Sequence, residues 1–348
     1  MRWGDVLTDL VKGTELTSDQ VAWAMGQILA GDATPVQIAG FAVALRAKGE
    51  TVGELTGLAD GMLAKATPIT LDGEAVDVVG TGGDRANTVN VSTMAAIVAA
   101  ACGAKVAKHG NRAASSACGT ADVLQALGVA LDVPPDRQPE VLAEAGIVFL
   151  FAPLYHPSLR HASSARGELG IQTSFNLLGP LANPARPLAQ AVGVADPRAA
   201  GLVAGVLAGR GCRGLVFHGS DGLDELTTTT TSRVWIFRDG QVKQDLLDPA
   251  TLGLVPATRD DLVGGDPAHN AAVVTSVLGG ELGPVHDIVA LNAAAALLAY
   301  EGPDVALPVG EQLSLRLART RTALTDGSAA ATLATWVAAS QARRPGAV

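Results

Sequence analysis

Residues 75–110 of this chain read AVDVVGTGGDRANTVNVSTMAAIVAAACGAKVAKHG, and this stretch decides the fold. The short apolar run AVDVV at 75–79 predicts a buried strand, the glycines after it predict a tight turn, and the apolar stretch from Ser92 to Ala101 predicts a helix. The run KVAKH at 105–109 predicts the next strand. Strands that alternate with helices in this way are typical of an α/β fold with a mainly parallel sheet.

The same alternation continues toward the C-terminus. Apolar runs predict strands at 147–151, 190–195 and 214–219, and helical patterns are found at 121–127, 197–209 and 286–300. A run of five threonines at 227–231 predicts a loop or an edge strand. We therefore expect a central, mainly parallel sheet flanked by helices.

The N-terminal part differs, because apolar residues at helical spacing predict four consecutive helices over residues 1–66. The pairs Thr17 with Gln20, Thr34 with Gln37 and Thr51 with Glu54 are capping boxes that mark helix starts. We expect an α-helical domain at 1–69, joined by an inserted, proline-rich helical segment at about 156–185, and an α/β domain at 70–348.

Composition and charge narrow the class of protein. The 348 residues are 48% hydrophobic and 17% charged, which excludes general disorder, and the net charge of −9 disfavours nucleic acid and anionic membranes as partners. The three cysteines are far apart and form no CxxC motif, so neither a disulfide framework nor a zinc site is indicated. Without an apolar leader in its N-terminal residues, the chain is expected to be cytoplasmic.

Two motifs near the first strand have the composition of an anion site. The loop GTGGD at 80–84 lets backbone N–H groups approach a phosphate, although a simple strand-to-helix turn needs the same glycines. Arg85 occupies the position where a dinucleotide fingerprint needs a small residue, and no GK[ST] sequence is present. The sequence NVST at 90–93 is either a set of helix caps or a set of phosphate and metal ligands.

Two further motifs follow predicted strands. The run KHGNRAASS at 108–116 concentrates basic, amide and hydroxyl side chains, which favours phosphate binding over a solvated polar loop. The adjacent carboxylates Asp224 and Glu225, which we expect in an exposed loop, are either a hydrophilic turn or ligands of Mg²⁺ on a diphosphate.

Six motifs in order resemble the anthranilate phosphoribosyltransferase family over about residues 20–300. They are GTGGD at 80–84, NVST at 90–93, KHGNRAASS at 108–116, GTADVL at 119–124, FNLLGPLANP at 175–184 and DGLDELTTTT at 221–230. The resemblance implies an enzyme of tryptophan biosynthesis that transfers the 5-phosphoribosyl group of phosphoribosyl pyrophosphate (PRPP) to the amine of anthranilate. It also implies two Mg²⁺ ions per active site, a cleft between the two domains, and a homodimer formed through the helical domain.

The resemblance also assigns roles to individual residues. It puts PRPP on Gly80, Gly83, Asp84, Thr88, Asn90, Val91, Ser92, Thr93, Lys108, His109, Gly110, Asn111, Arg112, Ala113, Ala114, Ser115, Ser116 and Thr120. It puts anthranilate on Gly80, Asn111 and Arg166, and the metal on Ser92, Asp224 and Glu225. No general base is assigned, and His109 is a candidate. The chain departs from the family pattern at Arg85, Thr120 and Gly167.

Two alternatives stay open at the level of sequence. A pyrimidine-nucleoside phosphorylase-like enzyme would share the fold, but its lysine-rich glycine signature is absent. A non-catalytic nucleic-acid-binding relative would have a basic groove and a degraded carboxylate pair, whereas Asp224 and Glu225 are both present. The chain carries no fused amidotransferase sequence, so any anthranilate synthase partner is expected to be a separate protein.

Overall fold

Four helices form the N-terminal part of the computed structural model, which describes residues 1–113 and 117–346. They are α1 (Trp3–Val11), α2 (Ser18–Ala30), α3 (Pro35–Lys48) and α4 (Val52–Leu63). The three predicted capping boxes are confirmed, since the hydroxyls of Thr17, Thr34 and Thr51 each accept the backbone N–H three residues later. Each box satisfies N–H groups that a helix start otherwise leaves without partners.

A seven-stranded sheet forms the centre of the larger part, in the order β3-β2-β1-β4-β5-β6-β7. Its strands are β1 (Val76–Gly80), β2 (Val106–Gly110), β3 (Ile147–Phe151), β4 (Ala189–Gly193), β5 (Arg213–Gly219), β6 (Ser232–Arg238) and β7 (Gln241–Leu247). The first five are parallel, as predicted, and β6 and β7 add an antiparallel edge. The threonine run at 227–231 is a loop.

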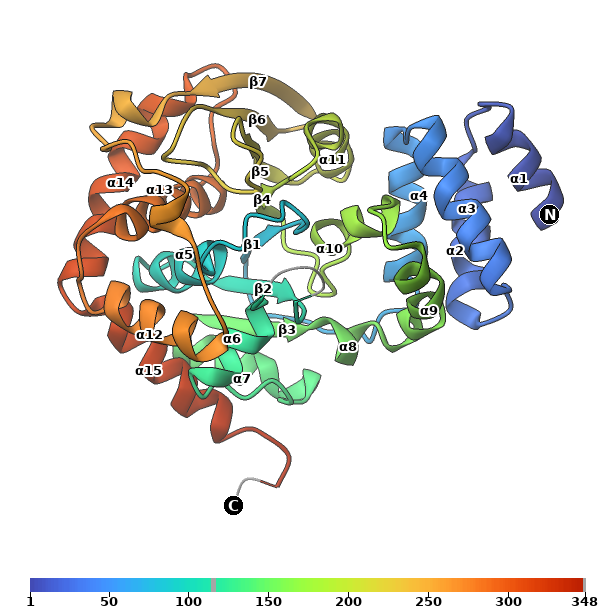
Figure 1. Cartoon of the computed structure of the whole chain (residues 1–348). Helices are drawn as coiled ribbons and strands as arrows, with labels where there is room; N and C mark the ends of the chain where they lie inside the picture. Colours follow the sequence, from blue (N-terminus) through green and yellow to red (C-terminus); the bar gives the residue numbers. More distant parts are fainter. Residues whose placement is uncertain (114–116, 347–348) are drawn as a thin grey trace.

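Helices cover both faces of this sheet (Figure 1). The helices after α4 are α5 (Val91–Ala101), α6 (Thr120–Ala126), α7 (Gln138–Ala145), α8 (Ala152–Tyr155), α9 (Arg160–Leu169), α10 (Leu178–Leu181), α11 (Pro197–Gly209), α12 (Pro267–Leu278), α13 (Pro284–Glu301), α14 (Val309–Thr325) and α15 (Ser328–Gln341), and not all of them contact the sheet. On one face α5 and α13 contact the sheet, with α14 and α15 packed outside them. On the other face α10 and α11 contact the sheet.

The second of these faces belongs to a core that the two parts of the chain share. Leu58 of α4, Val192 of β4 and Leu207 of α11 are all buried in one continuous apolar cluster. The segment from α8 to α10 leaves the sheet, and α9 packs against α2 and α3 as the sequence predicts. The helical part is therefore fixed beside the carboxyl ends of the strands, where ligands bind in open α/β sheets. Of the helices described, none is long and apolar enough to cross a bilayer.

Candidate active site

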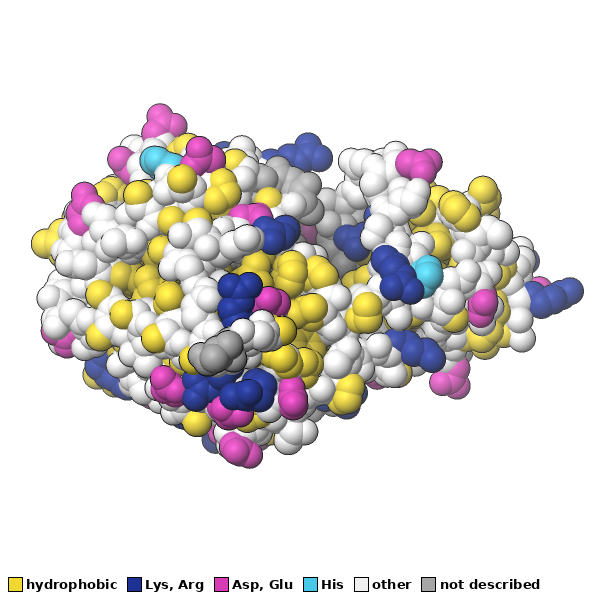
Figure 2. Space-filling model, turned by 90° about the horizontal axis from the view of Figure 1, so that it is seen from below, with side chains coloured by type: hydrophobic (Ala, Val, Ile, Leu, Met, Phe, Trp, Pro, Cys, Tyr) yellow, Lys and Arg dark blue, Asp and Glu magenta, His cyan; other side chains and the backbone are white. Residues whose placement is uncertain are grey.

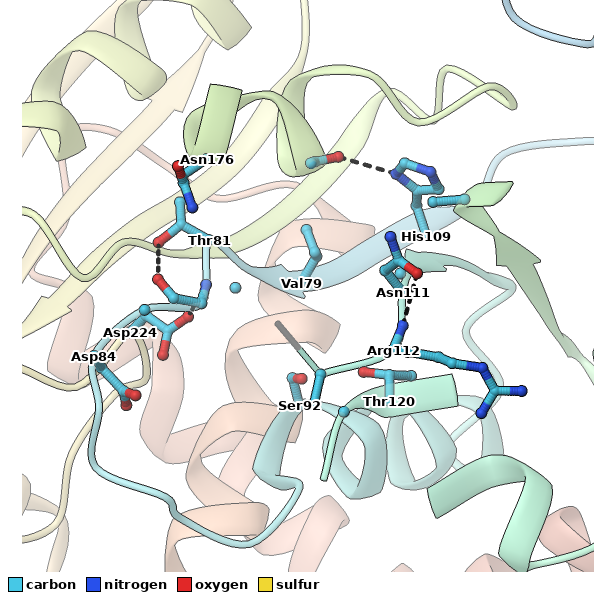
Figure 3. Close-up of a pocket in the computed structure, with 18 of the residues that line it drawn as sticks. Val79, Thr81, Asp84, Ser92, His109, Asn111, Arg112, Thr120, Asn176 and Asp224 are labelled. Carbon is cyan, nitrogen blue, oxygen red and sulfur yellow. Dashed lines mark hydrogen bonds between the residues drawn. The ribbon is translucent and has the colours of Figure 1, made fainter. Parts of the chain in front are cut away.

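A cavity of about 330 Å³ lies between the carboxyl ends of the parallel strands and the α8–α10 segment (Figure 3). Its size is within the range of small-molecule sites. The predicted site residues that line it are Gly80, Gly83, Asp84, Thr88, Asn90, Val91, Ser92, Lys108, His109, Gly110, Asn111, Arg112, Ala113, Thr120, Arg166, Asp224 and Glu225. Thr93 lies behind the wall, fully buried, with its hydroxyl 3.5 Å from the hydroxyl of Thr120. Ala114, Ser115 and Ser116 are outside the described residues.

The glycine loop after β1 is shaped around one carboxylate. The N–H of Gly82 donates to Oδ2 of Asp224 at 2.7 Å, and a Cβ atom added to Gly80 would overlap the same carboxylate. Gly82 and Gly83 have φ values of 68° and 84°, which favour glycine. The close approach of the backbone to Asp224 therefore depends on the glycines of this loop.

The carboxylates Asp224 and Glu225 were predicted in an exposed loop, and this expectation is wrong for Asp224, which is only 9% exposed. Burial, together with the charge of Asp84, raises the pKa of Asp224 to about 7. Burial and the neighbouring Asp224 also raise the pKa of Glu225 well above its usual range. Asp224 packs against Gly80 at the end of β1 and Gly193 at the end of β4, which are distant in sequence, so local sequence could not reveal this burial.

The donor set at this carboxylate pair fits a divalent cation held together with phosphate. Neither Asp224 nor Glu225 forms an ion pair with a lysine or arginine of the described chain, so their charges lack a close counterion. No cluster of three or more His, Cys, Asp or Glu side chains suited to a metal is found among residues 1–113 and 117–346. Mg²⁺ typically takes one or two carboxylates and completes its ligands with water and substrate phosphates. The pair therefore matches a magnesium site that needs a phosphate ligand.

Lys108 lies beneath the site and not in a solvated loop. Its side chain is almost fully buried, and its ammonium donates to the carbonyl of Val78 and to Oγ of Ser92, the latter at 3.3 Å. Burial lowers the pKa of Lys108, and the charges of Asp77 and Glu225 oppose that shift. The ammonium thus supplies positive charge where β1, β2 and the start of α5 meet.

His109 is held as a neutral imidazole. Its Nδ1 lies 3.0 Å from the carbonyl oxygen of Gly179, which can only accept, so we assign the ring proton to Nδ1. The buried Nε2 has no hydrogen-bond partner in the described chain. Burial, with the nearby ring of His156, lowers the pKa of His109 to about 3. The unpartnered lone pair of Nε2 is therefore an acceptor at neutral pH.

Sequence reasoning missed the pair that supports His109. Oδ1 of Asp77 accepts the backbone N–H of His109 at 3.1 Å, and Oδ2 accepts Nδ2 of Asn183 at 2.8 Å. Asn183 also donates to the carbonyl of Ala107 at 2.8 Å. A charged residue inside the apolar run AVDVV was the available signal, but its partner is 106 positions away.

The wall opposite the glycine loop is apolar and carries one arginine. The guanidinium of Arg166 lies 5.4 Å from the ring centre of Phe175, and it forms no ion pair with a carboxylate of the described residues. Met62, Leu159, Phe175 and Leu178 line this wall. They were not predicted individually, although FNLLGPLANP at 175–184 was the relevant motif. This wall suits a flat apolar molecule that carries an anionic group.

Arg112 lines the cavity but pairs with residues of the chain itself, and its role at PRPP stays a prediction. Its guanidinium donates to Oδ1 of Asp122 and to Oε1 of Gln125, both at 2.7 Å, and in Figure 3 it points away from the other labelled residues. The two departures that raised doubt, Arg85 and Gly167, are exposed and do not line the cavity. Arg85 has a φ of 58°, which is unusual for a residue with a side chain.

Positive charge is nevertheless concentrated near the cavity. On the face drawn in Figure 2, lysine and arginine side chains gather around the middle of the molecule, where the larger and smaller parts meet. Lys108, Arg112 and Arg166 are among the lining residues. The carboxylates Asp84, Asp224 and Glu225 line the same cavity, so cationic and anionic side chains meet there.

The fold and cavity correspond to a known class. Residues 4–66 match the helical bundle domain of a glycosyl transferase family, and residues 72–330 match the a/b domain of that family. These two domains, with the cavity between the sheet and the helical segment, place the chain in the class of glycosyl transferases.

Comparison with individual proteins narrows the class. The chain is 58% identical to anthranilate phosphoribosyltransferase from Acidothermus cellulolyticus over 98% of this chain and 96% of the relative. The structure of the Thermus thermophilus enzyme of that name has a TM-score of 0.89 at 41% identity, covering 97% and 99% of the two chains. The Saccharomyces cerevisiae enzyme, solved with PRPP and Mg, has a TM-score of 0.86 at 26% identity and covers 97% of each chain. The chain belongs to the anthranilate phosphoribosyltransferase family.

Proposed function

We propose that this protein transfers the 5-phosphoribosyl group of PRPP to the amine of anthranilate, giving N-(5-phosphoribosyl)anthranilate and pyrophosphate in tryptophan biosynthesis. The observation that carries the proposal is one cavity with two unlike ends. One end has the glycine loop, Lys108 and the carboxylates Asp224 and Glu225, and the other has an apolar wall with Arg166. The relative from Saccharomyces cerevisiae has been solved with PRPP and Mg and with 4-fluoroanthranilate, which supports the same pair of substrates here.

The phosphate groups of PRPP belong at the glycine-loop end. The side chain of Asn90 makes no capping hydrogen bond to α5, so the first N–H groups of this helix have no side-chain acceptor there. The N–H of Val91 donates to the carbonyl of Val89, and that of Thr93 to the carbonyl of Asn90, so it is the positive end of the helix dipole that favours an anion here. Lys108 adds a full positive charge beside Ser92. Gly80, Gly83, Asp84, Thr88 and Thr120 line the same end.

Ser92, Asp224 and Glu225 are the residues that would hold Mg²⁺, and we propose two ions per site. When bound, Mg²⁺ neutralises the negative charge that develops on the departing pyrophosphate. Asp224 accepts the N–H of Gly82, so the carboxylate pair and the glycine loop lie side by side at the diphosphate end of the cavity.

Anthranilate belongs between Asn111, Gly80 and Arg166, with its carboxylate on the guanidinium and its ring against the apolar wall. Its aromatic amine is unprotonated at neutral pH, so it can attack the anomeric carbon without prior deprotonation. The new C–N bond forms as the C–O bond to pyrophosphate breaks, with inversion at that carbon, and the cationic nitrogen then loses one proton to water or to the departing pyrophosphate. His109, whose pKa is about 3, is too weak a base to drive the step and instead offers Nε2 as a hydrogen-bond acceptor.

We also propose that two copies of the chain associate through the helical part. Val36 and Val43 are 81% and 40% exposed and lie seven residues apart on α3, hence on one outer face of the helical part. An exposed apolar face of this kind favours contact with a second copy of the chain. A homodimer through this face, a separate anthranilate synthase and a cytoplasmic location remain predictions.

The decisive experiment follows the fluorescence of anthranilate after mixing with the protein, PRPP and Mg²⁺. Fluorescence should fall only when all components are present, and EDTA should stop the loss. As a control, a pyrimidine nucleoside and phosphate should give no free base. Consumption of the nucleoside with no use of PRPP would favour the phosphorylase alternative and overturn the proposal.

A further inference from the structure

A second cavity, of about 320 Å³, lies on the other side of α10 from the candidate active site. Within α10, Gly179 lines the first cavity and Pro180 lines the second. The end of α4 divides in the same way, because Met62 lines the first cavity and Leu63 the second. Figure 1 shows α10 between the sheet and α4. The second cavity is therefore separate from the site described above, but both share these two walls.

Most of the surface of this cavity is aliphatic. Its apolar lining residues are Leu63, Pro180, Leu181, Pro187, Leu188 and Leu207. Leu188 is 47% exposed, which is unusual for a leucine beside a buried strand. A ligand with an apolar body would cover this surface.

One buried polar group in the cavity has an unused hydrogen-bonding atom. Gln190 of β4 is only 3% exposed, and its Nε2 donates to the carbonyl of Pro187 at 2.8 Å. Its Oε1 has no hydrogen-bond donor within the described chain. A buried acceptor without a donor is unfavourable. Because Oε1 is also shielded from the open cavity, an N–H group of a ligand would satisfy it after a small movement of the Gln190 side chain.

Charged groups complete the cavity. The guanidinium of Arg210 is already used, since it donates to the carbonyl of Leu181 at 2.7 Å and to Asp60 at 2.6 Å. Arg186, by contrast, is exposed, and its side chain makes no hydrogen bond or ion pair with any residue that the structure describes. Its φ of 49° is a strained conformation for a residue with a side chain. The cavity thus has a cation that is available for an anionic ligand group.

We propose that this cavity binds an α-amino acid with an apolar side chain. The carboxylate of the ligand pairs with Arg186, its ammonium group donates to Oε1 of Gln190, and its side chain covers the leucines. The three ligand groups thus pair with the free guanidinium, the acceptor without a donor and the apolar surface. A simple phosphate would pair with the guanidinium alone. This proposal does not depend on the transferase activity, because it concerns a different cavity.

Isothermal titration of the full-length protein with L-leucine, L-phenylalanine and L-tryptophan tests the proposal. At least one should bind saturably, with the same affinity whether or not PRPP, Mg²⁺ and an unreactive anthranilate analogue fill the first cavity. The corresponding amino-acid amide, which lacks the carboxylate, should bind at least about tenfold more weakly, as expected for loss of a hydrogen bond between charged groups.

Variants locate the binding. Arg186→Ala should weaken binding of the amino acid by about tenfold or more and weaken binding of the amide much less, because the amide carbonyl accepts a hydrogen bond from the guanidinium but carries no negative charge. Gln190→Met should weaken both ligands, and the exposed control Arg137→Ala should change neither. Melting temperatures of all three variants show that they are folded.

Three results would overturn the proposal. The first is the absence of saturable binding at concentrations well above the about 1 mM upper end of ordinary KM values. The second is binding that the anthranilate analogue abolishes, which would assign the amino acid to the first cavity. The third is unchanged affinity in both Arg186→Ala and Gln190→Met while these variants remain folded.

Discussion

Replacing Asp77 by asparagine should change how the stability of the protein depends on pH. Asp77 is fully buried, and burial raises its pKa from 3.8 to about 6, against the lowering effects of Asn183 and Lys108. The folded protein therefore binds this proton more tightly than the unfolded chain does. The cost of the ionised carboxylate is absent below pH 3.8, grows as pH rises, and is complete above about pH 6, where it reaches about 3 kcal/mol.

Asp77→Asn removes this charge at every pH. Its new amide N–H₂ must face either the N–H of His109 or the N–H₂ of Asn183, and this conflict costs free energy at all pH values alike. The difference in unfolding free energy between wild type and variant therefore changes with pH only through the titration of Asp77. It should shift by about 1 kcal/mol in favour of the variant between about pH 5 and about pH 7.5.

Urea unfolding at the two pH values, followed by tryptophan fluorescence and by circular dichroism, measures this shift. The two signals should coincide, because the calculation assumes a two-state transition. Asp239→Asn is a matched control, since the Asp239 side chain is 87% exposed in the turn between β6 and β7. A wild-type-minus-variant difference that is equal at both pH values would refute the reasoning on Asp77.

Three further outcomes are expected. Arg166→Ala should raise the KM for anthranilate by about 10- to 100-fold, which is the cost of losing one hydrogen bond to a charged group, and should change the KM for PRPP little. Equal effects on the two KM values in steady-state kinetics would mean that Arg166 is structural. Asp224→Asn with Glu225→Gln should lower kcat and kcat/KM for PRPP by orders of magnitude. The melting temperature should not fall, because the double variant removes two neighbouring buried carboxylates that repel each other. Wild-type turnover would exclude the pair from the mechanism. Val36→Lys with Val43→Lys should give a monomer in sedimentation velocity, whereas the wild type should be a dimer; a monomeric wild type would refute the predicted interface.

Much of the fold could be predicted because the relevant signals are local. The apolar run at 147–151 and the helical pattern at 197–209 match β3 and α11 at both ends. The antiparallel edge was missed. The buried apolar residues of β6, SRVWIFR, were an available signal, whereas β7 reads QVKQDLL and its mostly exposed, polar side chains give no apolar run. Its position depends on pairing with β6, which local composition does not encode.

The candidate site was predicted in outline for a topological reason. The motifs follow parallel strands, and the carboxyl ends of such strands meet at one edge of the sheet. What could not be predicted depends on contacts between distant segments, such as the ion pair of Arg112 with Asp122, the burial of Asp224, and the bond from Asn183 to Asp77.

The apolar core shared by α4, β4 and α11 has a consequence for how the protein loses its structure. Trp3 and Trp23 pack against that core from the helical part, and Trp235 is buried in it from the sheet. Melting of the N-terminal helices would expose the face of the sheet that carries Val192 to water, so neither part retains a complete interior without the other. A protein truncated to residues 70–348 would thus be expected to aggregate. In the full chain, heat should unfold the helical part and the α/β part together in a single calorimetric peak.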